Sequence, residues 1–478
     1  MKNLSQILKN IKINHDLVIK GIKTNSNQIE AGDLFLCIKG VNVDRHDYIE
    51  DAASRGAICA LVSKDVKASI PCIKVDDVDA LVDDIYRNFY DNPQDELFII
   101  GLTGTDGKTS TATIVQNLMG SDICGYIGTN GYGCAKFKRK TANTTPDKDK
   151  LYQYFREFVD AGCKYVAMEA SSEAFLRGRL STLQFRAAAI SNITSEHLNV
   201  HKTLENYISC KAQLFKQTTK DAVSILNHDD KHYEEIKAVA HNVKTYGRGQ
   251  DNDLWIKDYE IYPNKTKINF VYKDKEYNIE SPLLGGFNVE NLAEAMLLCL
   301  NLGLDMDVLI SRIKNLKISG RMEHISLGQD FYCLVDYAHT PNGITRFLEF
   351  AKTLDVKRKI VVIGQAGERD AYKRKEVGEI CARNADHVIF TYEDPRSEDV
   401  NDIIDDMCEN IHDLNNYERV IDRGEAIAKA INMAKKDDIV MILGKGAEDY
   451  QKLKSAVIHF SDIEEASKAI EKRLKNIK

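Results

Sequence analysis

The chain has 478 residues, of which 43% are hydrophobic and 29% are charged, so it is expected to fold around more than one core. Its formal net charge of −7 gives no general reason to bind nucleic acid. The sequence contains no run of about 18 apolar residues, the length that a membrane-spanning helix needs. We therefore expect a multidomain protein that binds neither nucleic acid nor membrane.

Cysteine spacing indicates a reducing compartment. The chain has 11 cysteines, an odd number, and no CxxC pair. This pattern disfavours both a disulfide framework and a zinc site. The N-terminus lacks the continuous apolar core of a signal peptide, so a cytoplasmic location is expected.

Residues 1 to about 90 have the pattern of a small mixed α/β module. Residues 34–38 and 57–62 predict short buried strands, and residues 48–55 predict a helix between them. The polar strings at 24–27 and 44–47 are expected to be loops. Asn92-Pro93 predicts a linker to the next module.

The stretch from Leu97 to Thr113, LFIIGLTGTDGKTSTAT, predicts a strand, a phosphate-binding loop and a helix. Gly104 and Gly107 would open the loop so that backbone amides can surround a polyphosphate. Lys108 would neutralise its charge, and the Thr109 hydroxyl could bind Mg²⁺. Gly101 stands one position before the first glycine of the strict pattern, so the loop is a variant. ATP or GTP is the expected ligand.

Residues 94–318 alternate apolar strands with helical stretches, which favours a largely parallel sheet covered by helices. The strand at 165–168 leads into Glu169, and the strand at 187–190 leads into a polar run that contains Glu196 and His197. Open α/β sheets bind ligands at such strand exits. With Lys211, these residues are candidates for magnesium-dependent phosphoryl transfer. Residues 251–282 predict an antiparallel excursion, and a helix is expected to begin in the segment 287–291.

From about residue 320 the pattern predicts a second, smaller doubly wound sheet. Its expected strands are 331–335, 359–363, 387–391 and 439–443, each separated by a helical segment. Residues 462–478 predict a charged amphipathic helix. From the residues alone, the chain is an ATP-using α/β enzyme of unknown substrate.

Ten short motifs are spread along the chain. They are GLTGTDGKTST (101–111), NTTPD (143–147), MEASS (168–172), SNITSEHLNVH (191–201), CKAQLF (210–215), GGFNVEN (285–291), SGRME (319–323), DYAHTP (336–341), EDPRSED (393–399) and GKGAEDYQ (444–451). They occur in the order seen in Mur ligases, and the chain most resembles the MurE branch, the UDP-N-acetylmuramoyl-dipeptide:diamino acid ligases of peptidoglycan synthesis. The resemblance extends over essentially the full length.

The resemblance implies three domains. Residues 1–92 would form a mixed α/β domain that binds the UDP substrate. Residues 93–318 would form the P-loop ATPase domain with a mostly parallel sheet, and residues 319–478 a Rossmann-like domain that binds the incoming amino acid.

The resemblance also assigns site residues. The ATP-binding residues would be Gly104, Thr105, Asp106, Gly107, Lys108, Thr109, Ser110, Asn288, Asn291, Arg321, Asp336 and His339. The metal ligands would be Thr109, Glu169, His197 and a carbamylated Lys211. The UDP substrate would be held by Ser26, His46, Thr144, Thr145, Ser171 and Arg179. The amino-acid pocket would contain Arg374, Glu393, Asp394, Pro395, Arg396, Gly444 and Glu448.

The implied reaction joins a diamino acid to UDP-MurNAc-L-Ala-D-Glu. The terminal carboxylate would attack the ATP γ-phosphorus to form an acyl phosphate, which the amine then attacks. Lys108, Lys211, His197 and Glu169 would be catalytic, with ATP and Mg²⁺ required and a CO₂-derived carbamate on Lys211. The working form is expected to be a monomer.

For the added amino acid, meso-diaminopimelate is slightly favoured and L-lysine is the next candidate. Arg396 suits the distal carboxylate of meso-diaminopimelate, whereas Glu393, Asp394 and Glu448 would also suit the ammonium of L-lysine. Asp106, Glu173 and Ala447 depart from the usual family residues. Two alternatives remain: a folylpolyglutamate-synthase-like ligase, and a non-catalytic regulatory paralogue that binds nucleotide sugars.

Overall fold

The computed structural model describes residues 1–39, 43–194 and 198–477. These form two compact units, Met1–Lys244 and Thr245–Lys478. The divisions expected after residues 92 and 318 remain predictions, because one compact unit can contain more than one domain. No helix in the described ranges is long and apolar enough to cross a membrane.

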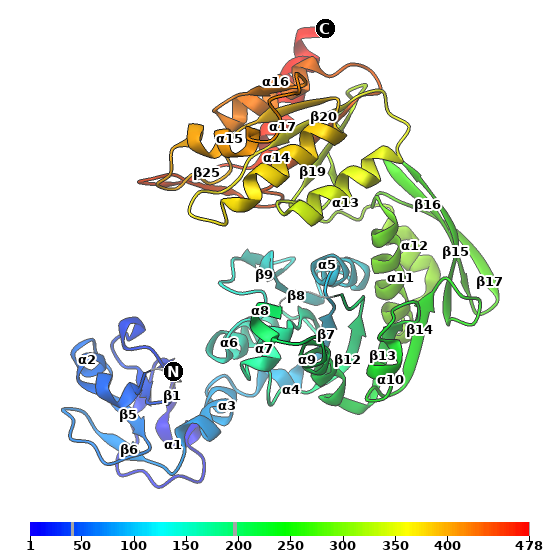
Figure 1. The fold of residues 1–478 in the computed structure, drawn as a ribbon. Coiled ribbons are helices and arrows are strands. Elements are labelled where there is room, and N and C mark those ends of the chain that lie inside the picture. The colour runs from blue at the N-terminus through cyan, green and yellow to red at the C-terminus, as the bar shows by residue number, and fades with distance from the viewer. Residues whose placement is uncertain (40–42, 195–197, 478) are drawn as a thin grey trace. The chain divides into compact units, whose positions relative to one another are not determined.

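The first part of the N-terminal unit contains a four-stranded parallel sheet with the order β3-β4-β5-β6 (Figure 1). The strands and the helix predicted here are confirmed, whereas both expected loops contain short 3₁₀ turns. The elements are β1 (Lys2–Asn3), α1 (Leu4–Ile7), β2 (Val18–Ile19), β3 (Ile22–Lys23), η1 (Ser26–Gln28), β4 (Leu34–Leu36), η2 (Arg45–Tyr48), α2 (Ile49–Ser54), β5 (Cys59–Val62), β6 (Cys72–Lys74) and α3 (Val78–Phe89).

The linker predicted at Asn92-Pro93 is instead the start of a helix. Asn92 adopts a left-handed backbone with φ of 51°, and helix α4 (Pro93–Glu96) begins at the proline. Proline suits this first position, because its missing N–H would have no partner inside the helix. The sequence therefore marked a break in the chain at Asn92, but the residues after it form a short helix.

The large sheet of this unit has β7 at its centre, between the parallel strands β11 and β12. Because its core strands are parallel, their carboxyl ends meet at one edge, where the predicted site residues lie. The elements are β7 (Phe98–Thr103), α5 (Lys108–Met119), β8 (Cys124–Gly128), β9 (Gly131–Cys134), β10 (Phe137–Arg139), α6 (Lys148–Asp160), β11 (Tyr165–Glu169), α7 (Ser172–Leu176), β12 (Phe185–Ile190), α8 (Leu198–His201), α9 (Leu204–Lys216), β13 (Thr218–Asn227), α10 (Tyr233–Lys237) and β14 (Val243–Gly247).

The displaced glycine of the phosphate loop has a packing role. Gly101 lies inside β7, and a Cβ there would be 2.3 Å from Leu214 Cδ1 and 2.8 Å from Phe185 Cδ1. Only a glycine leaves room for these two buried side chains. Gly101 therefore belongs to the core, and the loop itself relies on Gly104 and Gly107.

The C-terminal unit begins with the predicted antiparallel excursion, formed by β15 (Leu254–Tyr262), β16 (Lys265–Tyr272) and β17 (Lys275–Ser281) (Figure 1). The predicted helix follows as α11 (Gly286–Asn301), and α12 (Met306–Ile313) comes after it. Strand alternation and the Ala/Leu-rich helix were both correctly read from the sequence.

The second sheet of this unit has the order β18-β19-β23-β20-β21-β22, with every pair parallel except β18 with β19. Helices α13, α14 and α15 cover one face of this sheet, and α16 and α17 cover the other (Figure 1). Alternate residues of β20 face these two layers: Val361 and Ile363 pack with the first, and Ile360 and Val362 with the second. The elements are β18 (Glu323–His324), β19 (Tyr332–Asp336), α13 (Pro341–Lys352), β20 (Lys359–Ile363), α14 (Tyr372–Asn384), β21 (His387–Phe390), α15 (Val400–Cys408), β22 (Tyr417–Arg419), α16 (Arg423–Met433), β23 (Ile439–Leu443), β24 (Tyr450–Lys452), β25 (Val457–His459) and α17 (Asp462–Ile477).

Candidate active site

The phosphate loop leaves β7 and is held in shape by the residues that follow β12. Gly104 and Gly107 have φ of 145° and 88°, and a Cβ on Gly104 would be 2.0 Å from Ser191 Oγ. The Asp106 N–H donates to Asn192 Oδ1 at 3.0 Å, and its carbonyl accepts from the Ser191 hydroxyl. The loop is therefore fixed through its backbone, and the Asp106 side chain is exposed.

Two lysine side chains meet at the carboxyl end of β7. Lys108 Nζ donates to the carbonyls of Gly104 and Thr105, both at 2.8 Å. Lys211, which is buried, donates to the same Gly104 carbonyl at 2.6 Å, and its ammonium lies 4.4 Å from the centre of the Tyr207 ring. Two lysine side chains thus converge on one carbonyl at the end of β7.

Glu169 is fully buried at the end of β11, next to the start of α5. Its Oε2 accepts from the Thr109 hydroxyl at 2.9 Å. Its Oε1 accepts from the Tyr126 hydroxyl at 2.7 Å and from the Thr129 N–H at 2.9 Å. A Cβ on Gly128 would lie 2.0 Å from Oε1, so the close approach of β8 requires glycine there.

Tyr126, Gly128 and Thr129 were missed in the sequence. They come from the segment around the end of β8, about forty residues before Glu169 in the chain. No local motif marks them. They become neighbours of Glu169 because β8 pairs in parallel with β11.

The oxygens of Thr109 and Glu169 fit a magnesium ion. Both are hard ligands, and their hydrogen bond shows that they converge at one point. His197, the predicted third ligand, lies outside the described residues. Within the described ranges, no group of three His, Cys, Asp or Glu side chains gathers into a metal cage. Two protein oxygens suit Mg²⁺, since that ion usually keeps several water ligands.

Four residues predicted to hold the substrate do come together beside Glu169. The Thr145 hydroxyl donates to the Glu169 carbonyl at 2.8 Å, and the Ser171 N–H donates back to Thr145 Oγ1 at 3.0 Å. Arg179 Nη1 donates to the Thr145 carbonyl at 3.2 Å. Thr144 Oγ1 lies 3.0 Å from Thr129 Oγ1. These contacts connect the predicted substrate residues to the metal candidate.

His46 and Ser26 have protein partners in the first module. His46 Nε2 accepts from the Ser63 N–H at 3.0 Å, which leaves the ring proton on Nδ1, 2.6 Å from Asp44 Oδ1. Lys64 and then His46 hold the pKa of Asp44 well below its usual range. Within the described ranges, no hydrogen bond joins His46 or Ser26 to the Thr145 group. Their role toward UDP remains a prediction.

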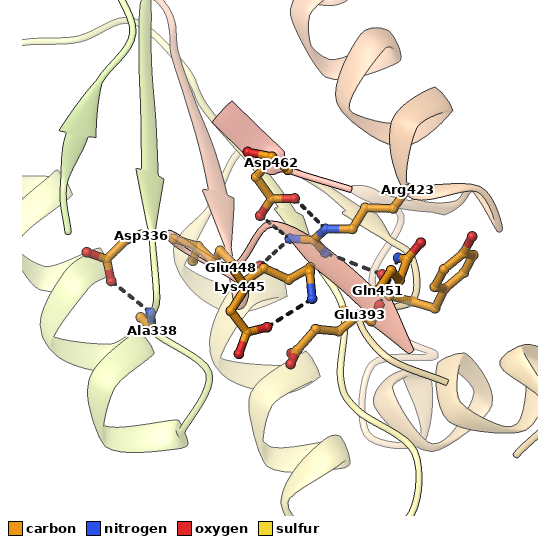
Figure 2. Close-up of polar contacts among 12 residues, drawn as sticks. Asp336, Ala338, Glu393, Arg423, Lys445, Glu448, Gln451 and Asp462 are labelled. Atoms are coloured by element: carbon orange, nitrogen blue, oxygen red, sulfur yellow. Dashed lines mark hydrogen bonds and ion pairs between the residues drawn. The ribbon is translucent and has the colours of Figure 1, made fainter. Parts of the chain in front are cut away.

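In the C-terminal unit, the residues predicted for the nucleotide lie on two segments. Asn288 Nδ2 donates to the Leu284 carbonyl at 2.8 Å, and Asn291 Nδ2 donates to Asn288 Oδ1 at 3.2 Å. Asp336 accepts backbone N–H groups from Met322 at 2.7 Å and Ala338 at 2.8 Å, and burial raises the pKa of its carboxyl (Figure 2).

Arg321 and His339 lie next to this second segment. The Arg321 guanidinium is 4.9 Å from the centre of the Tyr337 ring. His339 is exposed, and its Nδ1 donates to the Tyr337 carbonyl at 2.8 Å. A Cβ on Gly320 would lie 1.9 Å from Ala447 N, so the segment before Arg321 directly abuts the 444–448 loop.

The predicted amino-acid pocket lies at the ends of β21 and β23. Lys445 is fully buried, and its ammonium lies 2.9 Å from both Asp394 Oδ1 and Glu448 Oε2 (Figure 2). Gly444, with φ of 119°, keeps β23 close to Glu393, because a Cβ there would be 3.1 Å from Glu393 Oε2. Burial is the largest cause that raises the pKa of Glu393 to about 7.

Arg396 has a backbone that is rare for a residue with a side chain. Its φ is 53°, in the left-handed region, and its N–H donates to the Lys452 carbonyl at 3.0 Å. Among the described residues, its buried Nε has no hydrogen-bond partner. Strained residues with an unsatisfied polar group often belong to binding sites.

Arg423 was missed by the sequence, although it is fully buried beneath this pocket. Its guanidinium makes two hydrogen bonds of 2.7 Å to Asp462 and donates to the Leu443 carbonyl at 2.9 Å and to the Tyr392 carbonyl at 3.4 Å (Figure 2). Tyr392 and Leu443 directly precede the two pocket segments. Arg423 therefore fixes both segments relative to each other.

Arg374 and Pro395 lie close to other residues of the C-terminal unit. The guanidinium of Arg374 is 97% buried and lies 2.9 Å from Asp406 and 2.8 Å from Glu398. The Pro395 carbonyl would be 2.0 Å from a Cβ on Gly367. Both residues thus hold the loop that carries Arg396, and a direct contact of Arg374 with the amino acid stays a prediction.

Comparison with known proteins covers all three parts of the chain. The sequence model of the Mur ligase catalytic domain matches residues 18–91, that of the Mur ligase middle domain residues 102–299, and that of the Mur ligase glutamate ligase domain residues 320–446. The UDP-N-acetylmuramoyl-L-alanyl-D-glutamate–2,6-diaminopimelate ligase of Bacillus cereus is 36% identical over 96% of this chain and 95% of its own. The chain belongs to the Mur ligase family. As a Mur ligase it is an ATP-dependent acid–amino-acid ligase.

Other Mur ligases also match this chain over most of its length. The enzyme of the same name from Aquifex aeolicus is 34% identical over 93% of this chain and 92% of its own. A solved structure of such a ligase covers 99% of both chains with a TM-score of 0.72 and 28% identity. Mycobacterium tuberculosis folylpolyglutamate synthase, at 16% identity and a TM-score of 0.60, covers 76% of this chain and 92% of its own. That alternative therefore rests on a shared fold alone.

Proposed function

We propose that this Mur ligase uses ATP to join meso-diaminopimelate to UDP-MurNAc-L-Ala-D-Glu. The observation that carries this proposal is the pocket around Arg396, in which a buried guanidinium nitrogen has no partner among the described residues. A carboxylate would satisfy it with a charge-assisted hydrogen bond. The Bacillus cereus relative, which is named for 2,6-diaminopimelate, supports the same choice.

The pairing of Lys445 weakens the case for L-lysine. From the sequence, Asp394 and Glu448 were possible acceptors for a lysine ammonium. In the structure both carboxylates already contact the buried Lys445 ammonium at 2.9 Å. A substrate that brings a carboxylate as well as an ammonium fits this arrangement better than one that brings an ammonium alone.

The site beside β7 would bind the triphosphate and activate the acceptor carboxylate. Lys108 and the loop amides offset the repulsion between the ATP γ-phosphate and the attacking carboxylate. Thr109 and Glu169 would hold Mg²⁺, which supplies further neutralisation of phosphate charge. The Thr145 group lies against Glu169, so an acceptor bound there would reach the same end of the sheet.

A carbamate on Lys211 is the finer part of the proposal. Lys108 and Lys211 both donate to the Gly104 carbonyl, so two like charges lie close together. Carbamylation would replace one ammonium with an anion and turn repulsion into attraction. The Lys211 carbamate would also add oxygens that can bind the magnesium ion. We further propose that the enzyme works as a monomer in the cytoplasm.

Phosphate release by the purified protein tests the function. The assay would combine ATP, Mg²⁺ and UDP-MurNAc-L-Ala-D-Glu with meso-diaminopimelate, L-lysine or no amino acid. We expect release with meso-diaminopimelate well above that with L-lysine, and the tripeptide product by mass spectrometry. Release only with L-lysine, or with neither, would overturn the proposed substrate.

A further inference from the structure

We propose that Lys445 determines the amino-acid specificity of this ligase by acting as an internal cation. It neutralises Asp394 and Glu448, and so prevents these carboxylates from accepting the ammonium of a competing substrate such as L-lysine. Lys445 would act through its two partners and is therefore a positioning residue. The inference rests on the proposed function, because it concerns the pocket that receives the diamino acid.

The geometry places Lys445 between the two segments of the pocket. Asp394 belongs to the loop after β21, and Glu448 to the loop after β23, and the ammonium lies 2.9 Å from each. Asp394 Oδ1 also accepts the Lys452 N–H at 3.2 Å. The Lys445 side chain has no exposed surface, so water does not screen the pair as it would at the protein surface.

The balance of charge makes this contact important. Glu393, Asp394 and Glu448 bring three carboxyl groups to one small region. Figure 2 shows the Lys445 side chain in contact with Glu448 and near Glu393. Arg423, a second buried cation nearby, makes two hydrogen bonds of 2.7 Å to Asp462, and its charge also lowers the pKa of the Glu393 carboxyl. Removing the Lys445 charge would leave Asp394 and Glu448 without their paired cation and make the pocket more acidic.

The two candidate substrates differ in charge at the end that enters the pocket. The distal end of meso-diaminopimelate carries an ammonium and a carboxylate, whereas the distal end of L-lysine carries only an ammonium. A strongly acidic pocket would attract L-lysine and repel the diaminopimelate carboxylate. With Lys445 present, the pocket carries less negative charge, and Arg396 can bind the distal carboxylate of meso-diaminopimelate.

Two single variants with opposite charge changes test this inference. In Lys445→Met, the ratio of kcat/KM for meso-diaminopimelate to that for L-lysine should fall about tenfold, because the pocket loses a cation. In Asp394→Asn, which has nearly the same shape, the same ratio should rise about threefold, because an anion is lost. The KM values for ATP and UDP-MurNAc-L-Ala-D-Glu should not change in either variant.

The double variant Lys445→Met/Asp394→Asn restores the original net charge of the pair, so its ratio should return toward that of the wild type. Lys452→Met is the matched control. Its ammonium lies 5.2 Å from the centre of the Tyr450 ring, the same distance as that of Lys445, but its side chain is more exposed. The ratio should stay unchanged in this control.

If both single variants lower the ratio, Lys445 supports the loop only as a structural residue and the inference is wrong. If Lys445→Met does not fold, Asp394→Asn alone decides, since an unchanged or lower ratio contradicts the charge argument. Failure of the proposed function gives a different result, namely a wild-type enzyme that does not use meso-diaminopimelate.

Discussion

The phosphate loop and the amino-acid pocket differ in the groups that contact their lysine side chains. At the loop, Lys108 and Lys211 donate to backbone carbonyls, chiefly that of Gly104. At the pocket, Lys445 contacts two carboxylates at 2.9 Å. A hydrogen bond between two charged groups is stronger than one from a cation to a neutral carbonyl.

This difference indicates what each region is prepared to receive. The loop brings two lysine side chains to the point where the triphosphate and the acceptor carboxylate are proposed to bind. In the pocket, Lys445 pairs with Asp394 and Glu448, and the charged groups outside these pairs are proposed to select between substrates. Strong attraction suits the loop, because it must offset repulsion between anions, whereas the pocket must discriminate between similar amines.

The largest expected effect comes from removing the Lys211 side chain at the loop. Lys211→Ala should lower kcat by on the order of 10²–10³, because the site loses the group that, as a carbamate, is proposed to bind the metal next to the phosphates. Added short carboxylic acids or bicarbonate should partly restore the phosphate-release rate if Lys211 works as a carbamate.

Lys216→Ala is the matched control, since Lys216 lies exposed at the end of the same helix. It should leave the rate unchanged. Wild-type activity of Lys211→Ala without added acid would refute the carbamate role and weaken the contrast between the two regions.

A smaller effect is expected at the pocket. Arg396→Ala should lower kcat/KM for meso-diaminopimelate by about 100-fold, because the distal carboxylate would lose a buried charged partner. Use of L-lysine, which has no such carboxylate, should change little. Equal losses of kcat/KM for the two amino acids would show that Arg396 does not recognise the side chain of the added amino acid. The exposed Arg383→Ala variant serves as the control.

Tyr126→Phe should weaken Mg²⁺ binding at the proposed site by about tenfold, because a hydrogen bond to the proposed ligand Glu169 is lost while the ring remains. The Tyr126 hydroxyl donates to Glu169 Oε1 at 2.7 Å, and Thr129 N–H would remain as the second donor there. Mg²⁺ titration of phosphate release, together with Mn²⁺ binding followed by electron paramagnetic resonance, measures the change.

Tyr132→Phe provides a comparison for this variant, since the Tyr132 hydroxyl is directed to Glu157 instead. Its Mg²⁺ requirement should match that of the wild type. If Tyr126→Phe also behaves as the wild type, Glu169 does not depend on this hydroxyl.

A separate prediction concerns the pH dependence of stability. Burial raises the pKa of Glu393 from 4.5 to about 7. Between these values the unfolded chain loses the proton and the folded one keeps it, so the free energy of unfolding should fall by about 3 kcal/mol as pH rises. Above about pH 7 this group should cause no further change.

Urea unfolding of the wild type and of Glu393→Gln at several pH values checks this prediction. The variant should lack the part of the decline that Glu393 causes. An equally steep decline in both proteins would show that the Glu393 carboxyl is not the group involved, and that the pocket's charge is balanced in another way.

Much of the scaffold could be predicted because its signals are local. The apolar run into Gly101, the glycines of the loop and Lys108-Thr109 define β7, the loop and α5, and the structure confirms each of them. Glu169 was found for the same reason, since it directly follows a buried strand. Such patterns need no knowledge of distant contacts.

The residues that the sequence did not reveal depend on contacts between distant segments. Tyr126 matters because β8 lies beside β11, and Arg423 because α16 begins beneath the ends of β21 and β23. The acidic residues Asp394 and Glu448 looked ready to bind a substrate ammonium. Their partner Lys445 lay inside a recognised motif, but only the fold shows where its ammonium points.

The close approach of Gly320 and Ala447 matters for protein engineering. A methyl group on Gly320 would overlap the backbone of the 446–447 segment, at 1.9 Å from Ala447 N. A chimera that imports the 444–448 loop from a ligase of different specificity must therefore keep glycine at position 320. Any side chain there would displace the imported loop.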